Sequence, residues 1–349
     1  MIEAPSPALA ERAGVRAPAE PTLSERGALR VRAGTHALSL LANPLNVHVL
    51  TALEREPKSL VELRRAVGSP PQTTMRGHLR TLTSLGVLER RRQPEFPGSV
   101  DYQLGPAGRD MLAVVRILQG WLASAPDGPL QPGSPAAKSA IKALVEGWSS
   151  TIVRAIAARP LSLTDLNRLI SSLNYPSLER RLGAMRLAGQ LEPSPSAGRS
   201  RPYVATDWLR RAVAPLAAAA GWERRHAPAE SSPIARLDIE SAFLLILPMV
   251  QLDEDYSGTC RLAVETRSAE GDALIGVMAR VETGRVVSCV ARLSGSADSW
   301  VAGSTRAWMG AALRGESDLL EIGGDADLAH ALIRGLARTL LGTPLTQPK

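Results

Sequence analysis

Apolar positions follow one pattern that occurs twice along this chain. Each copy has apolar residues at helical spacing, then a proline, a short second helical segment, a third helical segment with arginines, and a stretch in which apolar and polar residues alternate. The copies run from Leu38 to Gln93 and from Ile141 to Ser196. Three helices followed by a small hairpin are typical of a winged helix-turn-helix, so the pattern predicts two such domains in one chain.

The apolar spacing of each third helix predicts its buried side. Met75, Leu79 and Leu82 fall at positions i, i+4 and i+7, which places them on one face of a helix that opens at Pro70-Pro71. The corresponding residues of the second copy are Leu178, Leu182 and Met185. We therefore expect these side chains to pack on a core and the remaining side chains of each helix to face outward.

The last third of the chain changes its period. Its apolar runs predict strands at 259–266, 273–281, 285–293 and 319–322, and helices at 296–314 and 326–341. The predicted fold class is a multidomain, mainly α chain, with two tandem winged helix-turn-helix domains and a C-terminal α+β domain. The predicted boundaries are a disordered tail at 1–24, winged helices at 25–124 and 138–226, linkers at 125–137 and 227–233, and the C-terminal domain at 234–343.

The formal net charge of +7 is spread unevenly along the chain. Residues 1–232 hold 30 Lys and Arg against 19 Asp and Glu, a balance of +11, whereas residues 233–349 hold 11 against 15, a balance of −4. The basic part coincides with the repeat, which favours binding of a polyanion such as DNA by that part.

The sequence gives no sign of catalysis, of a metal site or of a membrane segment. Cys260 and Cys289 lie in apolar alternating segments without a Cys/His cluster, which predicts small core residues rather than a metal site or a disulfide. We find no Ser/His/Asp arrangement and no phosphate-binding glycine loop, so neither an enzyme nor a cofactor is expected. The longest apolar run, 242–250, is far shorter than the ~20 residues of a membrane helix, and the first residues lack the apolar core of a signal peptide. These features predict a cytoplasmic protein.

Polar side chains on the outer face of the first copy's third helix are suited to reading DNA. These residues are Gln72, Thr73, Arg76 and Arg80. In the major groove Gln pairs with adenine, Arg pairs with guanine, and Thr contacts the thymine methyl group. Arg90, Arg91 and Arg92 begin the wing, where backbone phosphates are expected. Alternation in the hairpin predicts that one of these three arginines is a flank or packs inward.

The second copy carries a different set of outward residues. They are Ser177, Arg180 and Arg181 on the third helix, with Arg199 and Arg201 in the wing. Glu179 lies among them, and a carboxylate near phosphates is unfavourable unless it accepts a hydrogen bond from a cytosine amino group. This copy therefore either reads a different half-site or is a degenerate copy that is kept for packing.

Five short segments carry a family resemblance: 60–65 (LVELRR), 78–82 (HLRTL), 86–90 (GVLER), 100–104 (VDYQL) and 105–109 (GPAGR). Over roughly residues 30–122 they make the first copy similar to the HxlR type of winged-helix regulators and, more loosely, to the ArsR type. The second copy, about 138–225, is similar but weaker. The resemblance implies a bacterial transcription regulator, and such regulators are usually homodimers. Many members use a cysteine as a redox switch, but both repeats lack cysteine.

The C-terminal third resembles sterol-carrier-type domains, which bury an apolar ligand between a curved sheet and helices. The resemblance rests on 295–300 (GSADSW), 313–316 (LRGE) and 320–329 (LEIGGDADLA). It implies a pocket lined by apolar residues such as Phe243, Leu245, Leu274, Val277, Met278, Trp300, Trp308 and Met309. Trp300 and Trp308 are expected on nearby faces of one helix. The alternatives are that these residues simply fill the core, or that the domain serves dimerisation.

These observations together predict a bacterial transcription regulator. It would read double-stranded DNA with two winged helices and be controlled by a hydrophobic small-molecule effector bound in the C-terminal domain. The alternative is a small-molecule carrier or a protein-interaction module whose winged helices serve packing. The sequence leaves open the operator, the effector, the sign of regulation, and the choice between a monomer and a homodimer.

Overall fold

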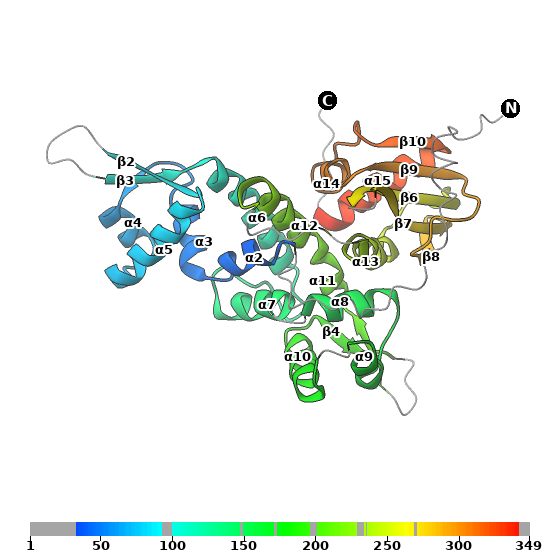
Figure 1. Cartoon of the computed structure of the whole chain (residues 1–349), viewed down its shortest axis with the longest axis horizontal. Helices are drawn as coiled ribbons and strands as arrows, with labels where there is room; N and C mark the ends of the chain where they lie inside the picture. The colour runs from blue at the N-terminus through cyan, green and yellow to red at the C-terminus, as the bar shows by residue number, and fades with distance from the viewer. Residues whose placement is uncertain are drawn as a thin grey trace. The chain divides into compact units, whose positions relative to one another are not determined.

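The computed structural model describes residues 33–92, 100–146, 149–170, 173–195, 201–228, 234, 236–268 and 271–341. The chain divides into two compact units (Figure 1). We call residues 29–147 with 215–233 the N-terminal unit, and residues 148–214 with 234–349 the C-terminal unit. The predicted tail at 1–24, the tip of the first wing, most of the second hairpin loop and residues 229–233 of the second predicted linker lie outside the described residues.

The N-terminal unit holds the first copy of the repeat and two further helices. Its helices are α2 (Thr35–Leu41), α3 (Pro44–Ala52), α4 (Leu60–Ala66), α5 (Gln72–Ser84), α6 (Pro106–Ala123), α7 (Pro135–Val145) and, from Pro215 on, α12 (Val213–His226). Its strands are β1 (Lys58–Ser59), β2 (Leu88–Arg92) and β3 (Val100–Leu104), in the antiparallel order β1-β3-β2. Helix α3 starts at Pro44, where the side chain of Asn43 accepts a hydrogen bond from the N–H of Leu45 at 3.0 Å.

Local sequence signals fix the pair of helices α4 and α5. A capping box starts α4, with the Ser59 hydroxyl accepting from the Glu62 N–H and the Glu62 carboxylate accepting from the Ser59 N–H. These hydrogen bonds from the backbone and hydroxyl of Ser59 lower the pKa of Glu62. Gly68 has a φ of 87°, which turns the chain between the two helices. Met75, Leu79 and Leu82 are at most 1% exposed, as predicted.

Helix α12 attaches to the first copy through buried polar contacts. The carboxylate of Glu223 is fully buried and accepts hydrogen bonds from the N–H groups of Gly34 at 2.7 Å and Ala37 at 2.8 Å. It thereby caps α2, which has no capping side chain of its own. Gly34 has a φ of 85°, and a Cβ there would lie 2.5 Å from the carbonyl oxygen of Leu216, so only glycine fits.

The C-terminal unit begins with the second copy of the repeat. Its elements are α8 (Ser149–Ala158), α9 (Leu163–Leu169), α10 (Tyr175–Leu187), β4 (Leu191–Pro193), β5 (Tyr203–Ala205) and α11 (Asp207–Arg211). A capping box of Ser162 and Asp165 starts α9, as Ser59 and Glu62 start α4. The buried residues of α10 are Leu178, Leu182 and Met185, as predicted. The two segments therefore share a capped short helix and a third helix with its apolar residues buried.

The limits predicted for the second winged helix, 138–226, do not coincide with a unit. The helical segment that closes this copy is broken at Ala212 into α11 and α12. Helix α7 and most of α12 belong to the N-terminal unit. The physical reason is that the residues that α12 buries find their partners in the first copy: the indole N–H of Trp222 donates to the carbonyl of Ala107 at 2.8 Å.

A five-stranded sheet completes the C-terminal unit. The elements are α13 (Arg236–Ile246), a 3₁₀ turn (Leu247–Met249), β6 (Gly258–Ser268), β7 (Gly271–Glu282), β8 (Arg285–Val290), β9 (Ser299–Ser304), α14 (Thr305–Arg314), β10 (Glu321–Gly324) and α15 (Ala326–Leu341). The strand order is β10-β9-β6-β7-β8, in which only the β6–β9 pair is parallel. Helices α13, α14 and α15 pack on one face of this sheet (Figure 1).

The helix predicted for 296–314 is wrong over its first part. Residues 299–304 form β9, which pairs with β6 and β10, and the helix starts only after Ser304. Ser304 stops the strand because its side chain caps α14 by accepting from the Ala307 N–H at 3.2 Å. Tertiary pairing overrides the helical spacing of the small residues here. Helix α13 was not predicted at all, since its sequence reads only as an apolar run.

Helix α13 joins the second copy to the sheet. The guanidinium of Arg154 on α8 pairs with the Asp238 carboxylate, with Nε to Oδ1 at 2.7 Å, and the Arg154 side chain is only 8% exposed. On α11, Arg210 donates to the carbonyl of Leu245 at 2.9 Å and so binds a carbonyl at the C-terminal end of α13. The second copy and the α+β part are therefore packed as one body.

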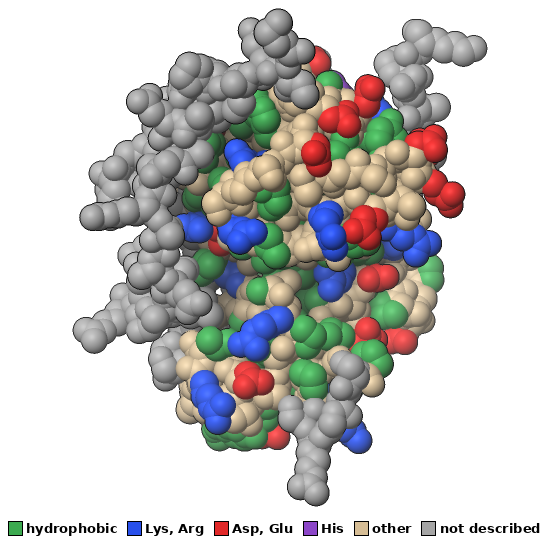
Figure 2. Space-filling view, turned by 90° about the vertical axis from the view of Figure 1, so that its right-hand side faces the viewer, with side chains coloured by type: hydrophobic (Ala, Val, Ile, Leu, Met, Phe, Trp, Pro, Cys, Tyr) green, Lys and Arg blue, Asp and Glu red, His purple; other side chains and the backbone are tan. Residues whose placement is uncertain are grey.

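The other face of the sheet is covered only in part. Gly323 leaves room for the Trp300 ring, since a Cβ on Gly323 would lie 2.4 Å from that ring. Arg261 donates to the Gly295 carbonyl at 2.6 Å across the same face. Figure 2 shows the side of the molecule with the sheet, and where it is not grey the hydrophobic side chains are scattered among polar and charged ones. This surface therefore carries no single large apolar patch in that view.

Candidate nucleic-acid interface

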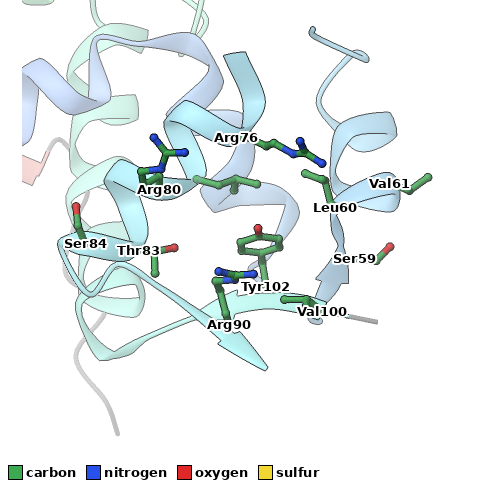
Figure 3. A pocket seen from close by; sticks show the side chains of 11 residues that line it. Ser59, Leu60, Val61, Arg76, Arg80, Thr83, Ser84, Arg90, Val100 and Tyr102 are labelled. Carbon is green, nitrogen blue, oxygen red and sulfur yellow. The ribbon is translucent and has the colours of Figure 1, made fainter. Parts of the chain in front are cut away.

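A groove of about 720 Å³ lies between α4, α5 and the wing strands of the N-terminal unit (Figure 3). Its lining residues are Ser59, Leu60, Val61, Arg76, Leu79, Arg80, Thr83, Ser84, Arg90, Val100 and Tyr102. Helix α5 contributes one wall, β2 and β3 the floor, and the start of α4 the opposite wall. Three of the predicted DNA-binding residues, Arg76, Arg80 and Arg90, thus come together in one concave surface.

The electrostatics of this groove favour an anion. The described residues that line it include three arginines and no carboxylate. Arg76, Arg80 and Arg90 are exposed, and none of them has a salt-bridge partner within the described part of the chain. The guanidinium of an arginine without an internal partner keeps all its N–H donors available for a ligand. A phosphate can accept two of these hydrogen bonds at once.

Hydroxyl groups add donors between the arginines. Tyr102 lies opposite Arg90 in the register of β2 and β3, and Figure 3 shows its hydroxyl directed toward α5. The hydroxyl oxygen of Thr83 is buried and has no hydrogen-bond partner. A buried hydroxyl at the edge of a groove is left unsatisfied unless a ligand or a water molecule reaches it. Sequence reasoning missed both residues, because only the strand register places Tyr102 beside Arg90.

Contacts with α3 hold the helix that carries these arginines. The ring Nδ1 of His78 lies 2.8 Å from the Asn46 side-chain oxygen, and the Asn46 amide donates to the Leu40 carbonyl at 2.8 Å. Asn46 is 4% exposed, so this chain of hydrogen bonds is shielded from water. It fixes the rotation of α5 and thereby the direction of its outer face.

The outer face of α5 is as predicted. Gln72, Thr73, Arg76 and Arg80 are all exposed. Gly77 lies among them, and a Cβ there would meet no atom within 4 Å. Packing inside the protein therefore does not require this glycine, and the open space suits the approach of an outside group.

None of the three wing arginines packs inward, but they do not all line the groove, which agrees with the predicted alternation. Arg90, Arg91 and Arg92 are all exposed. Their alternation is confirmed by the register, in which Arg90 faces Tyr102 and Arg91 faces Asp101. In β2 only Leu88 reaches the core, and the four residues after it are exposed. Only Arg90 of the three lines the groove.

The second copy presents a weaker surface. Arg180 and Arg201 are exposed, whereas Ser177 and Arg181 are half-buried, and Arg181 already has an interaction within the protein. The backbone N–H of Ser177 is bonded to the capping side chain of Asn174. Arg199 lies outside the described residues. The predicted set is therefore only partly available at this copy.

The structure does not gather the eight predicted ligand-binding residues into one place. Phe243, Val277 and Trp308 belong to the core between the sheet and the helices, where the rings of Phe243 and Trp308 meet edge to face at 5.1 Å between centroids. Trp300 lies on β9, where its register partner is Arg261 of β6. Both side chains are on the face of the sheet that points away from the helices. The expectation that Trp300 and Trp308 share one helix is therefore wrong.

The other members of that predicted set differ in burial. Met278 is buried and is the register partner of Arg261, which puts it on the same face as Trp300. Leu245 is buried on α13, whereas Leu274 and Met309 are half-buried on β7 and α14. The pocket that the sterol-carrier resemblance implies stays a prediction.

Among the described residues, no three His, Cys, Asp or Glu side chains come together in a way that could hold a metal ion. Within the same residues, no helix has the length and apolar character needed to cross a membrane.

Comparisons with known proteins match the first copy. Residues 40–127 match the HxlR-like helix-turn-helix family, which agrees with the resemblance found over roughly 30–122. None of the curated proteins matches the chain significantly. Residues 40–127, within the N-terminal unit, are thus similar to the HxlR-like helix-turn-helix.

Three solved structures are similar to a quarter of the chain. The diamide-treated YodB from B. subtilis is 29% identical, with 25% of this chain and 85% of that chain covered and a TM-score of 0.24. The reduced form of the transcriptional regulator YodB is 28% identical, with 25% and 86% covered and a TM-score of 0.24. A protein described as a transcriptional regulator of the MarR family from Enterococcus faecalis V583 is 27% identical, with 25% and 78% covered and the same TM-score of 0.24.

Proposed function

We propose that this protein is a DNA-binding transcription regulator that contacts duplex DNA through the first copy, with α5 in the major groove and the wing on the backbone. The observation that carries the proposal is the groove between α5 and the wing, which has three unpaired arginines and no carboxylate. The HxlR-like helix-turn-helix family match over 40–127 supports the same conclusion. No catalytic role is part of the proposal.

The residues divide into two kinds of contact. Gln72, Thr73 and Arg76 lie in the first half of α5, the part of a recognition helix that meets base edges. Arg80, Arg90 and Tyr102 line the groove between α5 and the wing, where a sugar–phosphate strand fits. The apolar wall of Leu60 and Val61 suits the deoxyribose rings that alternate with phosphates.

We also propose that the second copy is a second winged helix. Its support is the repeated order of helix, capped helix, helix and two-stranded hairpin, with matching capping boxes on α4 and α9. The α+β part is attached to this copy by Arg154–Asp238 and by Arg210, so a change there is transmitted to α8 and α11. Control by a hydrophobic effector stays a prediction, as does the alternative of a carrier or interaction module.

Binding to a duplex from the protein's own promoter region tests the function directly. We expect sequence-dependent binding whose affinity falls steeply as salt rises, because each neutralised phosphate adds about −0.9 to the slope of log K against log salt. A scrambled duplex of equal length is the control. Equal, salt-insensitive binding of both duplexes, or none at all, would remove the proposal and leave the carrier or interaction alternative.

Thiol oxidants should not change this DNA binding. Burial raises the pKa of Cys260 to about 11 and that of Cys289 to about 12, so both thiols stay protonated at neutral pH. Neither cysteine lies in a copy of the repeat. We expect diamide to leave the dissociation constant unchanged and a thiol reagent to react slowly with the folded chain. Rapid labelling, with loss of DNA binding that a reductant restores, would contradict this.

A further inference from the structure

The helices that pair in the N-terminal unit are equivalent elements of the two copies. In the register that aligns Met75, Leu79 and Leu82 with Leu178, Leu182 and Met185, α2 corresponds to α7 as the first helix. In the same register α6, the closing helix of the first copy, corresponds to α11 and α12, which close the second copy. The N-terminal unit therefore contains both first helices and most of both closing helices.

Each of these helices contacts its own equivalent. Helix α2 packs against α7. The start of α6 is bound by α12, since Ala107 accepts from Trp222 and the Asp110 carboxylate meets Arg225 at 2.9 Å and His226 at 2.8 Å. Contact between equivalent elements is the signature of a two-fold interface between like subunits. Here a single chain makes that interface with itself.

This internal interface leaves no room for a second chain. Trp222 and Glu223 are fully buried in it, and Glu223 occupies the N-terminus of α2. Gly34 is so close to the backbone of α12 that a single Cβ would overlap the Leu216 oxygen. A second copy of the chain could use the same face of α2 and α6 only after α12 had been removed.

The two copies carry different chemistry at the positions that form the groove. In the same register, Arg76 corresponds to Glu179 and Arg80 to Gly183. The wing position of Arg90 corresponds to Pro193, since each is the strand partner of a tyrosine, Tyr102 or Tyr203. All three groove arginines are therefore missing from the second copy, and one is replaced by an acid. Two such surfaces cannot read the same half-site.

We propose that one chain, paired with itself through α2–α7 and α6–α12, is the complete DNA-binding unit, and that its target is an asymmetric site. The first copy makes the groove contacts, and the second contributes different and weaker ones. The part that concerns DNA rests on the proposed function. The part that concerns pairing rests only on contacts inside the N-terminal unit.

The mass of the full-length protein in solution tests the pairing. We expect light scattering to give the mass of one chain, 37.1 kDa, from low micromolar up to about 100 µM protein, because the pairing face is already filled. Twice that mass at any of these concentrations would overturn the proposal. This readout needs no variant and no DNA, so it stands whether or not the protein binds duplexes.

Selection from a random duplex pool tests the asymmetry. We expect a consensus without two-fold symmetry and a complex with one chain per duplex. A palindromic consensus or two chains per duplex would overturn the proposal even if binding is tight and specific. If the pool yields no preferred sequence and binding is insensitive to salt, the proposed function fails, and the mass measurement alone then decides whether the chain is paired with itself.

Discussion

Replacing Arg76, Arg80 and Arg90 together by alanine should weaken binding to a cognate duplex by at least ~10²-fold, because each lost contact to a base or phosphate costs about 1–3 kcal/mol. These three side chains converge in one groove and have no salt-bridge partner among the described residues, so their removal leaves the described contacts of the fold intact. The slope of log K against log salt should become shallower by about 2 units, as the phosphate contacts of Arg80 and Arg90 disappear. Fluorescence anisotropy over a salt series measures both quantities.

A second triple variant provides the matched control. Arg116, Lys138 and Lys142 lie on α6 and α7 of the same unit, outside the groove. Their replacement by alanine removes the same charge, and we expect less than a five-fold loss of affinity. If both triple variants lose affinity equally, general charge and not the groove is responsible for binding. A groove variant that binds like the unmodified protein would move the interface elsewhere.

Single variants separate base reading from phosphate binding at the same site. Arg76→Ala should relax the preference at one base position, whereas Arg90→Ala should lower affinity uniformly across sequences. Tyr102→Phe removes a hydroxyl but no charge, so affinity should fall while the salt slope stays the same. A selection experiment with each variant gives these readouts. An unchanged preference in the Arg76 variant would show that this residue reads no base.

Replacing Glu223 by alanine should destabilise the N-terminal unit by about 2–4 kcal/mol, because it leaves the buried N–H groups of Gly34 and Ala37 without an acceptor. Glu223→Gln keeps an acceptor oxygen and should cost less. The control is Glu54→Ala, whose exposed salt bridge to Arg116 is worth about 0–1 kcal/mol. Chemical denaturation of the full chain measures all three variants. A Glu223→Ala variant no less stable than the Glu54→Ala control would contradict the capping role.

The pH dependence of stability gives a second readout for Glu223. Burial raises the pKa of this carboxyl above its ordinary value of 4.5. The folded chain therefore holds this proton more tightly than the unfolded chain does, and stability from this group is fully present below the ordinary pKa. It is lost as the pH rises through the raised pKa. The stability difference between the unmodified protein and Glu223→Gln should accordingly shrink with rising pH and then level off.

Local patterns predicted much of the first copy. The capping box of Ser59 and Glu62 and the apolar spacing of Met75, Leu79 and Leu82 depend on residues a few positions apart, so the sequence carries them directly. The outward direction of Arg76 and Arg80 follows from the same periodicity. These parts of the site could be found without coordinates.

Contacts between distant segments could not be predicted in this way. Glu223 caps a helix 189 residues earlier in the chain, and neither end of that contact carries a local signal. Tyr102 enters the groove only through its register with Arg90. Trp300 was expected on a helix because small and apolar residues surround it, and the pairing of β9 with two neighbouring strands outweighed that local preference.

Pairing of the chain with itself affects how substitutions accumulate in its two copies during evolution. In an assembly of two identical chains, every substitution appears on both sides of the symmetry axis, so a change that harms one side harms the other. A chain that contains both sides meets each substitution once. Selection can then keep Arg76, Arg80 and Arg90 on one side while Glu179, Gly183 and Pro193 accumulate on the other. The duplicated half is thereby free to drift in its surface chemistry as long as α7 and α12 still fit against their equivalents.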